Sequence, residues 1–345
     1  MAAPIVLGPN QPPRFYRGGA GIARFRGTPQ PSQYVPEDWV ASTTTIFGEA
    51  ALGLTRLAGG ATLRSAIAAA PGDFLGPDHV ARHGAEPALL VKLLDTAERL
   101  VVHFHPGREF AGRHLGSRYG KTEAWIVLDA SPSSRVYLGF KEDADPADVR
   151  RLVAGQDVAA LLGALNEVPV AAGDTWLVPA GMPHAIGPGV TVVELQEPTD
   201  LSVLLEWAGF PVDGPRDGHL GLGFDVALSA LDLSGWDSRR LDVASRGFRI
   251  GAGKRPGVTP LLPAGADPFF RAERVDVTAP VRFEPGYAIL VVVSGAGRIT
   301  YPGGSLPVGR GATVLVPYGA GVTTLEGALL AVRCRPPRLL ASVRV

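Results

Sequence analysis

Short apolar runs separated by turn residues dominate the chain. Runs at residues 89–105, 123–128, 173–179 and 190–196 consist of strand-forming residues and are bounded by Gly, Pro or Asp. This pattern is typical of strands in a turn-rich β protein. Residues 89–105 hold two such stretches around a polar turn and predict a β-hairpin, although the pattern of the first stretch also suits a helix. We expect the chain to be mainly β.

Helical patterns occur at only a few places. Residues 62–71 predict a short helix with Thr62 as its N-cap and Pro71 at its end. Asp145 precedes Pro146, and apolar residues then follow at helical spacing, so residues 145–166 predict a helical insertion between strands. A further helix is expected near residues 224–231.

The order of these patterns suggests two β domains. Residues 1–36 are rich in Gly, Pro and Arg and predict an irregular N-terminal arm. Residues 37–210 predict a first β domain, interrupted by the helical insertion, and residues 211–265 a mixed connection. Strand-like runs return in residues 266–345, which contain no histidine and predict a second β domain.

Charge and cysteine content limit the classes of partner. The chain has 33 basic and 33 acidic residues, so no overall field attracts nucleic acid or an anionic membrane surface. A small-molecule partner is favoured. Cys334 is the only cysteine, which excludes an intramolecular disulfide and is typical of a reducing compartment. Because neither a signal-peptide pattern nor a long apolar stretch is present, we expect a cytoplasmic protein outside the membrane.

Three histidines and one glutamate form a candidate metal site. His103 and His105 are one residue apart, so in a strand both point to the same face. Glu123 opens a neighbouring apolar run, and His184 follows a turn rich in Gly and Pro. Three imidazoles and a carboxylate suit zinc, iron, manganese, nickel or copper better than calcium or magnesium.

These motifs carry a family resemblance. The His-x-His pair and the Gly-x5-Pro-x-Gly-x2-His element at residues 173–184 resemble the cupin jelly roll. With their flanks, the blocks at residues 90–95, 105–106, 120–125 and 178–187 resemble successive blocks of class I mannose-6-phosphate isomerases, in order and spacing. Residues 292–297 also resemble that family's second domain. The resemblance implies two cupin domains with a helical insertion, of which only the first, at 37–210, binds metal.

Two positions depart from the family pattern. The family usually has glutamine at the position of His103, and an active-site arginine at the position of Leu204. The implied ligand set is therefore His103, His105, Glu123 and His184, with one divalent metal ion. Zinc is favoured, and iron, manganese and nickel are alternatives. Because leucine cannot bind an anion, both a sugar and a sugar phosphate stay open as substrates.

Conversion of an aldose to a ketose needs a Lewis acid on the sugar oxygens and a base over the carbon that loses a proton. Glu194 is the first candidate for the base, with Glu206 as its competitor and a possible contact to substrate. Lys121 lies two residues before Glu123 and can stabilise a developing oxyanion. Lys92 can orient a hydroxyl, and Arg108 can hold a phosphate.

The first functional hypothesis is a metal-dependent aldose–ketose isomerase, an intramolecular oxidoreductase. It would convert mannose 6-phosphate to fructose 6-phosphate, or a related sugar. The alternatives are a metallo-cupin oxygenase or lyase, and a sugar-binding cupin without turnover. Leu204 favours the alternatives, whereas the intact blocks around Lys121 and Glu194 favour the isomerase. The sequence does not predict the oligomeric state.

Overall fold

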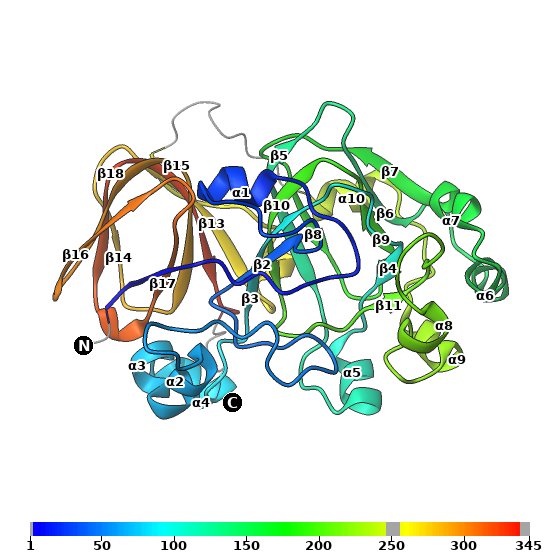
Figure 1. Cartoon of the computed structure of the whole chain (residues 1–345), viewed down its shortest axis with the longest axis horizontal. Coiled ribbons are helices and arrows are strands. Elements are labelled where there is room, and N and C mark those ends of the chain that lie inside the picture. Colours follow the sequence, from blue (N-terminus) through cyan, green and yellow to red (C-terminus); the bar gives the residue numbers. More distant parts are fainter. Residues whose placement is uncertain (1–2, 246–255, 339–345) are drawn as a thin grey trace.

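The computed structural model describes residues 3–245 and 256–338. Its strands form three antiparallel sheets, two with five strands and one with eight. The eight-stranded sheet lies at one end of the molecule, and the helices α6 (Pro146–Gly155) and α7 (Val158–Ala164) lie at the other (Figure 1). The expectation of a mainly β fold is confirmed. The limits of the two domains stay a prediction.

The two five-stranded sheets face each other across a common core. Leu94 and Trp125 of the first sheet pack with Val136 and Ile186 of the second. The first sheet has the order β2-β3-β10-β5-β8, and the second β11-β4-β9-β6-β7. The strands of the first sheet are β2 (Glu37–Val40), β3 (Leu90–Asp95), β5 (Glu123–Ala130), β8 (Thr175–Val178) and β10 (Val190–Gln196). Those of the second are β4 (His103–Phe104), β6 (Arg135–Phe140), β7 (Leu165–Pro169), β9 (His184–Ile186) and β11 (Val203–Leu204).

The hairpin expected at residues 89–105 is wrong, because its two strands belong to different sheets. β3 pairs with β2 and β10, whereas β4 pairs with β9 and β11. The connection is held by Thr96, whose N–H donates to Val190, and by Leu100, whose N–H donates to Ile186 of the second sheet. These hydrogen bonds hold a corner at which the chain passes from the first sheet to the second. The hydrophobic pattern of such a corner is the same as that of a hairpin.

Side-chain alternation on the first sheet separates apolar from charged positions. Val91 and Leu93 of β3 belong to the core shared with the eight-stranded sheet. Lys92 lies between them on the opposite face, which looks toward the second sheet. β10 pairs in register with β3, with Glu194 directly opposite Lys92. The face between the two five-stranded sheets therefore carries buried charges as well as apolar residues.

The eight-stranded sheet contains a strand from the N-terminal arm. β1 (Ile5–Leu7) pairs with β17, and the arm also forms the short helix α1 (Gly21–Arg26). The arm is therefore less irregular than the sequence predicted, because its apolar residues Leu7 and Phe25 join a buried core. The remaining strands are β12 (Gly257–Pro260), β13 (Arg271–Val277), β14 (Val281–Phe283), β15 (Ala288–Tyr301), β16 (Gly304–Gly309), β17 (Thr313–Val316) and β18 (Thr323–Arg335).

The predicted helices are confirmed with small changes. Thr62 caps the helix α2 (Leu63–Ala69) by accepting from Ser65 N–H, and Asp145 caps α6 in the same way. The insertion is two helices, because Gln156 takes a left-handed conformation between them, with φ of 49°. The remaining helices are α3 (Pro71–Leu75), α4 (Pro77–His83), α5 (Arg108–Leu115), α8 (Gly214–Asp217), α9 (Phe224–Ala227) and α10 (Ser238–Ala244). No described helix is long and apolar enough to span a membrane.

Candidate metal centre and active site

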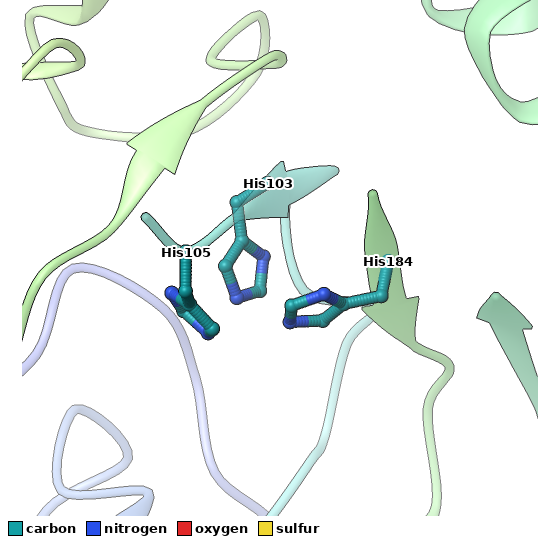
Figure 2. Close-up of side chains that lie close together, drawn as sticks. All are labelled: His103, His105 and His184. Carbon is teal, nitrogen blue, oxygen red and sulfur yellow. The ribbon is translucent and has the colours of Figure 1, made fainter. Parts of the chain in front are cut away.

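Three imidazole rings converge between the two five-stranded sheets (Figure 2). His103 of β4 is the direct partner of His184 of β9, and His105 follows two residues later on the same face as His103. The ring centroids are 4.3 to 4.9 Å apart. One nitrogen from each ring lies within 4.8 Å of the others, so the three histidines could hold a metal ion.

Each ring is oriented by a backbone carbonyl. The Nδ1–H of every one of these histidines donates to a carbonyl oxygen at 2.8 Å, and a carbonyl can only accept. The other nitrogen, Nε2, is therefore left without a proton and free to bind a cation, as in known metal sites where a partner fixes the tautomer. The acceptors are Val101 for His103, Leu201 for His105 and Met182 for His184.

Glu123 reaches the same point from β5. Its Oε2 lies 3.0 Å from His105 Nε2, and its Oε1 lies 3.3 Å from His184 Nε2. The indole of Trp125 donates to Oε1 at 2.9 Å and orients the carboxylate. Lys121 Nζ is 3.2 Å from Oε2 and 2.9 Å from His105 Nε2. Burial opposes ionisation of Glu123, but Lys121 and His105 outweigh it and hold the pKa of Glu123 well below its usual value.

The residues present fit a metal ion. His184 Nε2 is fully buried and has no hydrogen-bond partner among the described residues. Burial, together with the neighbouring positive groups, lowers the pKa of His103 well below its usual value and that of His105 to about 3. The rings of His103 and His105 are therefore neutral, which is the state that binds metal. Three imidazole nitrogens and a carboxylate are a usual donor set for zinc and for other first-row divalent metals.

A buried chain of charges continues from this centre across the first sheet. Lys92 Nζ lies 3.5 Å from Glu37 Oε2 and 3.6 Å from Glu194 Oε1. Burial raises the pKa of Glu194 to about 7, because Lys92 offsets only part of the cost of ionising a carboxyl there. Glu194 Oε1 is buried without a hydrogen-bond partner among the described residues. The site thus contains one carboxyl whose pKa lies near neutral pH.

The N-terminal arm contributes residues that sequence reasoning missed. Arg14 and Tyr16 line the cavity that holds the histidines, and so do Glu37 and Asp200. The Tyr16 hydroxyl donates to Glu37, and Arg14 binds Asp200. Burial opposes ionisation of Glu37, but Arg14 and Lys92, with hydrogen bonds from Tyr16 and Trp39, lower its pKa to about 2. The sequence gives no signal for Glu37, which stands beside a second acid in Glu37-Asp38-Trp39-Val40, and an irregular arm gives none for Arg14.

The structure brings together seven of the predicted site residues and leaves two outside. His103, Glu123, His184, Lys92, Lys121 and Glu194 line one cavity, and His105 contacts Glu123 beside it. Arg108 on α5 is bound to Glu197, and its guanidinium lies over the ring of Phe269. Glu206 is buried and bound by Arg99 and by the N–H of Val102. Neither Arg108 nor Glu206 lines the cavity, because each is engaged in an ion pair elsewhere.

Comparisons with known proteins find similar sequences among isomerases. No protein-family model matches the chain. It is 26% identical to a probable mannose-6-phosphate isomerase of Bacillus subtilis over 95% of this chain and 97% of that protein. It is 38% identical to the mannose-6-phosphate isomerase of Streptococcus mutans over a shorter stretch, 32% of this chain and 34% of that protein.

Solved structures show the same fold over nearly the whole chain. The mannose 6-phosphate isomerase of Bacillus subtilis superposes with a TM-score of 0.77 at 21% identity, covering 97% of this chain and all of that one. A mannose 6-phosphate isomerase bound with zinc and yttrium superposes with a TM-score of 0.71 at 16% identity, covering 98% of this chain and all of that one. The chain therefore has the fold of these isomerases, and its sequence is similar to that of a probable mannose-6-phosphate isomerase over nearly its whole length.

Proposed function

We propose that this chain is a metal-dependent isomerase that interconverts mannose 6-phosphate and fructose 6-phosphate. One observation carries the proposal: two imidazoles, Glu123, an ammonium group and a carboxyl with a pKa near 7 line one cavity, and a third imidazole contacts Glu123 beside it. These are the parts that transfer of a proton between neighbouring carbons requires. The names of the similar proteins supply the substrate.

The proposed metal ligands are His103, His105, Glu123 and His184. A divalent ion held there would act as a Lewis acid on the carbonyl and hydroxyl oxygens of the sugar. Lys121 lies beside this point, with its Nζ 2.9 Å from His105 Nε2. Its positive charge stabilises an oxyanion that develops on the substrate, in a cavity where water does not screen it.

Glu194 is the proposed base. A general base is most effective when its pKa lies near the working pH, and burial raises the pKa of Glu194 to about 7. Its Oε1 has no other hydrogen-bond partner among the described residues, so it is free to take a proton from carbon and return it to the neighbouring carbon. Lys92, 3.6 Å away, holds the carboxylate in place and can donate to a sugar hydroxyl.

A metal-resolved activity assay tests the proposal. The purified protein is stripped with a chelator, reloaded separately with zinc, iron, manganese or nickel, and supplied with mannose 6-phosphate. We expect fructose 6-phosphate from the reloaded protein and none from the stripped protein. Oxygen consumption by the iron form without fructose 6-phosphate would favour an oxygenase. A loaded protein that binds the sugar phosphate without turnover would favour a binding module.

A further inference from the structure

The cavity with the histidines opens into an outer groove. Five residues line both spaces and form the mouth between them: Arg14, Phe15, Asp200, Ser202 and Leu204. The cavity has a volume of about 60 Å³, and the groove about 710 Å³. Small-molecule sites usually have about 300 to 1,000 Å³. A sugar whose reacting end lies at the histidines must therefore extend through the mouth into the groove.

Arg14 is the one cationic residue shared by cavity and groove among the described lining residues. Its Nη1 and Nη2 lie 3.1 and 3.4 Å from the two carboxylate oxygens of Asp200, which fixes the plane of the guanidinium. Asp200 is itself held in place, since its Oδ2 accepts from the N–H of Phe47 at 3.3 Å. Arg14 is therefore oriented before any ligand arrives.

The guanidinium keeps donors for a ligand. A guanidinium has about five N–H donors, and Asp200 accepts hydrogen bonds from only two of the nitrogen atoms of Arg14. Arg14 Nε is buried and has no hydrogen-bond partner among the described residues, with Glu37 Oε1 3.6 Å away. A planar donor fork of this kind suits the oxygens of a phosphate.

Arg216 and Leu204, which also line the groove, do not offer an oriented set of donors for a phosphate. Arg216 binds Asp217 through Nε and Nη2 at 2.8 and 2.7 Å, and its side chain is 72% exposed. Solvent weakens any contact that such an exposed side chain makes. Leu204 presents only an apolar surface to the mouth.

We propose that Arg14 determines specificity by binding the phosphate group of the sugar at the mouth, so that the opposite end of the sugar reaches the histidines. Asp200 is a positioning residue that holds the guanidinium. This inference rests on the proposed function and names the residue that recognises the anion. It assigns to the N-terminal arm a part of the substrate site.

Substrate selectivity tests the role of Arg14. The variant Arg14→Leu is compared with the wild type on mannose 6-phosphate and on unphosphorylated mannose, with metal loaded. We expect the KM for mannose 6-phosphate to rise about ten- to hundredfold, the loss typical of one charge-assisted contact, with a smaller change in kcat. The loss on mannose should be smaller, so that the ratio of kcat/KM for mannose 6-phosphate to kcat/KM for mannose falls at least tenfold. Equal losses on both sugars would overturn the proposal.

Two further variants separate recognition from folding. Arg17→Leu removes a neighbouring arginine of the same arm, which pairs with Glu98 at the surface and does not line the cavity, and it should keep the wild-type selectivity. Arg14→Lys keeps the charge but loses the planar fork, so its KM should lie between those of wild type and Arg14→Leu. Near-equal KM values for the lysine and leucine variants would contradict anion binding.

Calorimetry with inorganic phosphate gives a readout that does not depend on turnover. The wild type should bind phosphate at least tenfold more tightly than Arg14→Leu, and the metal content of the two should be equal. If the wild type isomerises neither sugar, the proposed function fails, whereas this measurement still decides the role of Arg14. Equal affinity of wild type and Arg14→Leu for phosphate would overturn that role.

Discussion

His103 and His184 face each other across β4 and β9, and each ring is tied to the carbonyl oxygen of the residue two positions before it in the chain. The same hydrogen bond, from Nδ1–H to a carbonyl oxygen two residues earlier, therefore occurs on two paired strands. Because the rings lie on one face and both Nδ1 atoms are engaged, both Nε2 atoms point to one place, with ring centroids 4.3 Å apart. The backbone therefore orients both rings of the candidate metal site.

The first prediction concerns position 103, where class I mannose-6-phosphate isomerases usually have glutamine and this chain has histidine. His103→Gln places the usual glutamine of the family at this position, so we expect the variant to keep one divalent metal ion per chain. His184→Ala should weaken metal binding by more than about a hundredfold, because loss of a partner that merely orients a ligand already costs about 10- to 100-fold. Metal analysis after dialysis measures both. Complete loss of metal from His103→Gln would contradict the proposed ligand set.

The pKa of Glu194 predicts a pH dependence. A base must be deprotonated to act, and burial raises the pKa of Glu194 to about 7. We therefore expect kcat/KM to rise as the pH increases toward 7 and to level off above it. Glu194→Gln should lower kcat by about 100- to 10,000-fold and leave metal content unchanged. A Glu194→Gln enzyme with the activity of the wild type would exclude this carboxyl as the base.

Lys92 predicts an effect on stability. Its ammonium is buried between Glu37 and Glu194, and these two carboxylates outweigh the cost of burial and raise its pKa. Lys92→Met leaves buried negative charge without its partner, which typically costs about 3 to 5 kcal/mol. The free energy of unfolding from denaturant titration at pH 7 measures the change. Lys141→Met, at an exposed lysine outside the cavity, should change it by less than about 0.5 kcal/mol.

Gly120 gives a prediction about backbone packing beside the site. A Cβ at this position would lie 2.6 Å from the carbonyl oxygen of Pro106 and 2.7 Å from the N atom of Arg108. Gly120→Ala should therefore push apart the segments that carry His105 and Lys121, and weaken metal binding. Gly112→Ala is the matched control, since its Cβ would meet only Ser117 O at 3.7 Å, an ordinary contact. Equal metal affinity of the two variants would show that this close approach is unimportant.

Much of the site could be predicted because it follows from local rules. Strand alternation puts His103 and His105 on one face, while their neighbours Val102 and Phe104 pack into the core behind the second sheet. The apolar run opened by Glu123 and the Gly/Pro-rich turn before His184 completed the predicted set, and the structure brings both residues to the same cavity. The N-cap at Asp145 could be predicted for the same reason, because its side chain accepts from N–H groups only two and three residues later.

The parts that failed depend on long-range packing. The apolar run at residues 89–105 does not reveal that β3 and β4 enter different sheets, because a corner and a hairpin have the same hydrophobic pattern. Arg14 lies in a segment without periodicity, and only its contact with Asp200 places it at the mouth. Arg108 pairs with Glu197 outside the cavity, and its role in binding a phosphate stays a prediction.

The most direct test of the account is conversion of mannose 6-phosphate to fructose 6-phosphate by metal-loaded and metal-stripped protein at pH 7.5. We expect turnover that disappears with a chelator and returns when zinc or another first-row divalent metal is restored at one ion per chain. Turnover that persists after the metal has been fully removed would exclude a metal-dependent isomerase, and so would a loaded protein that forms no fructose 6-phosphate.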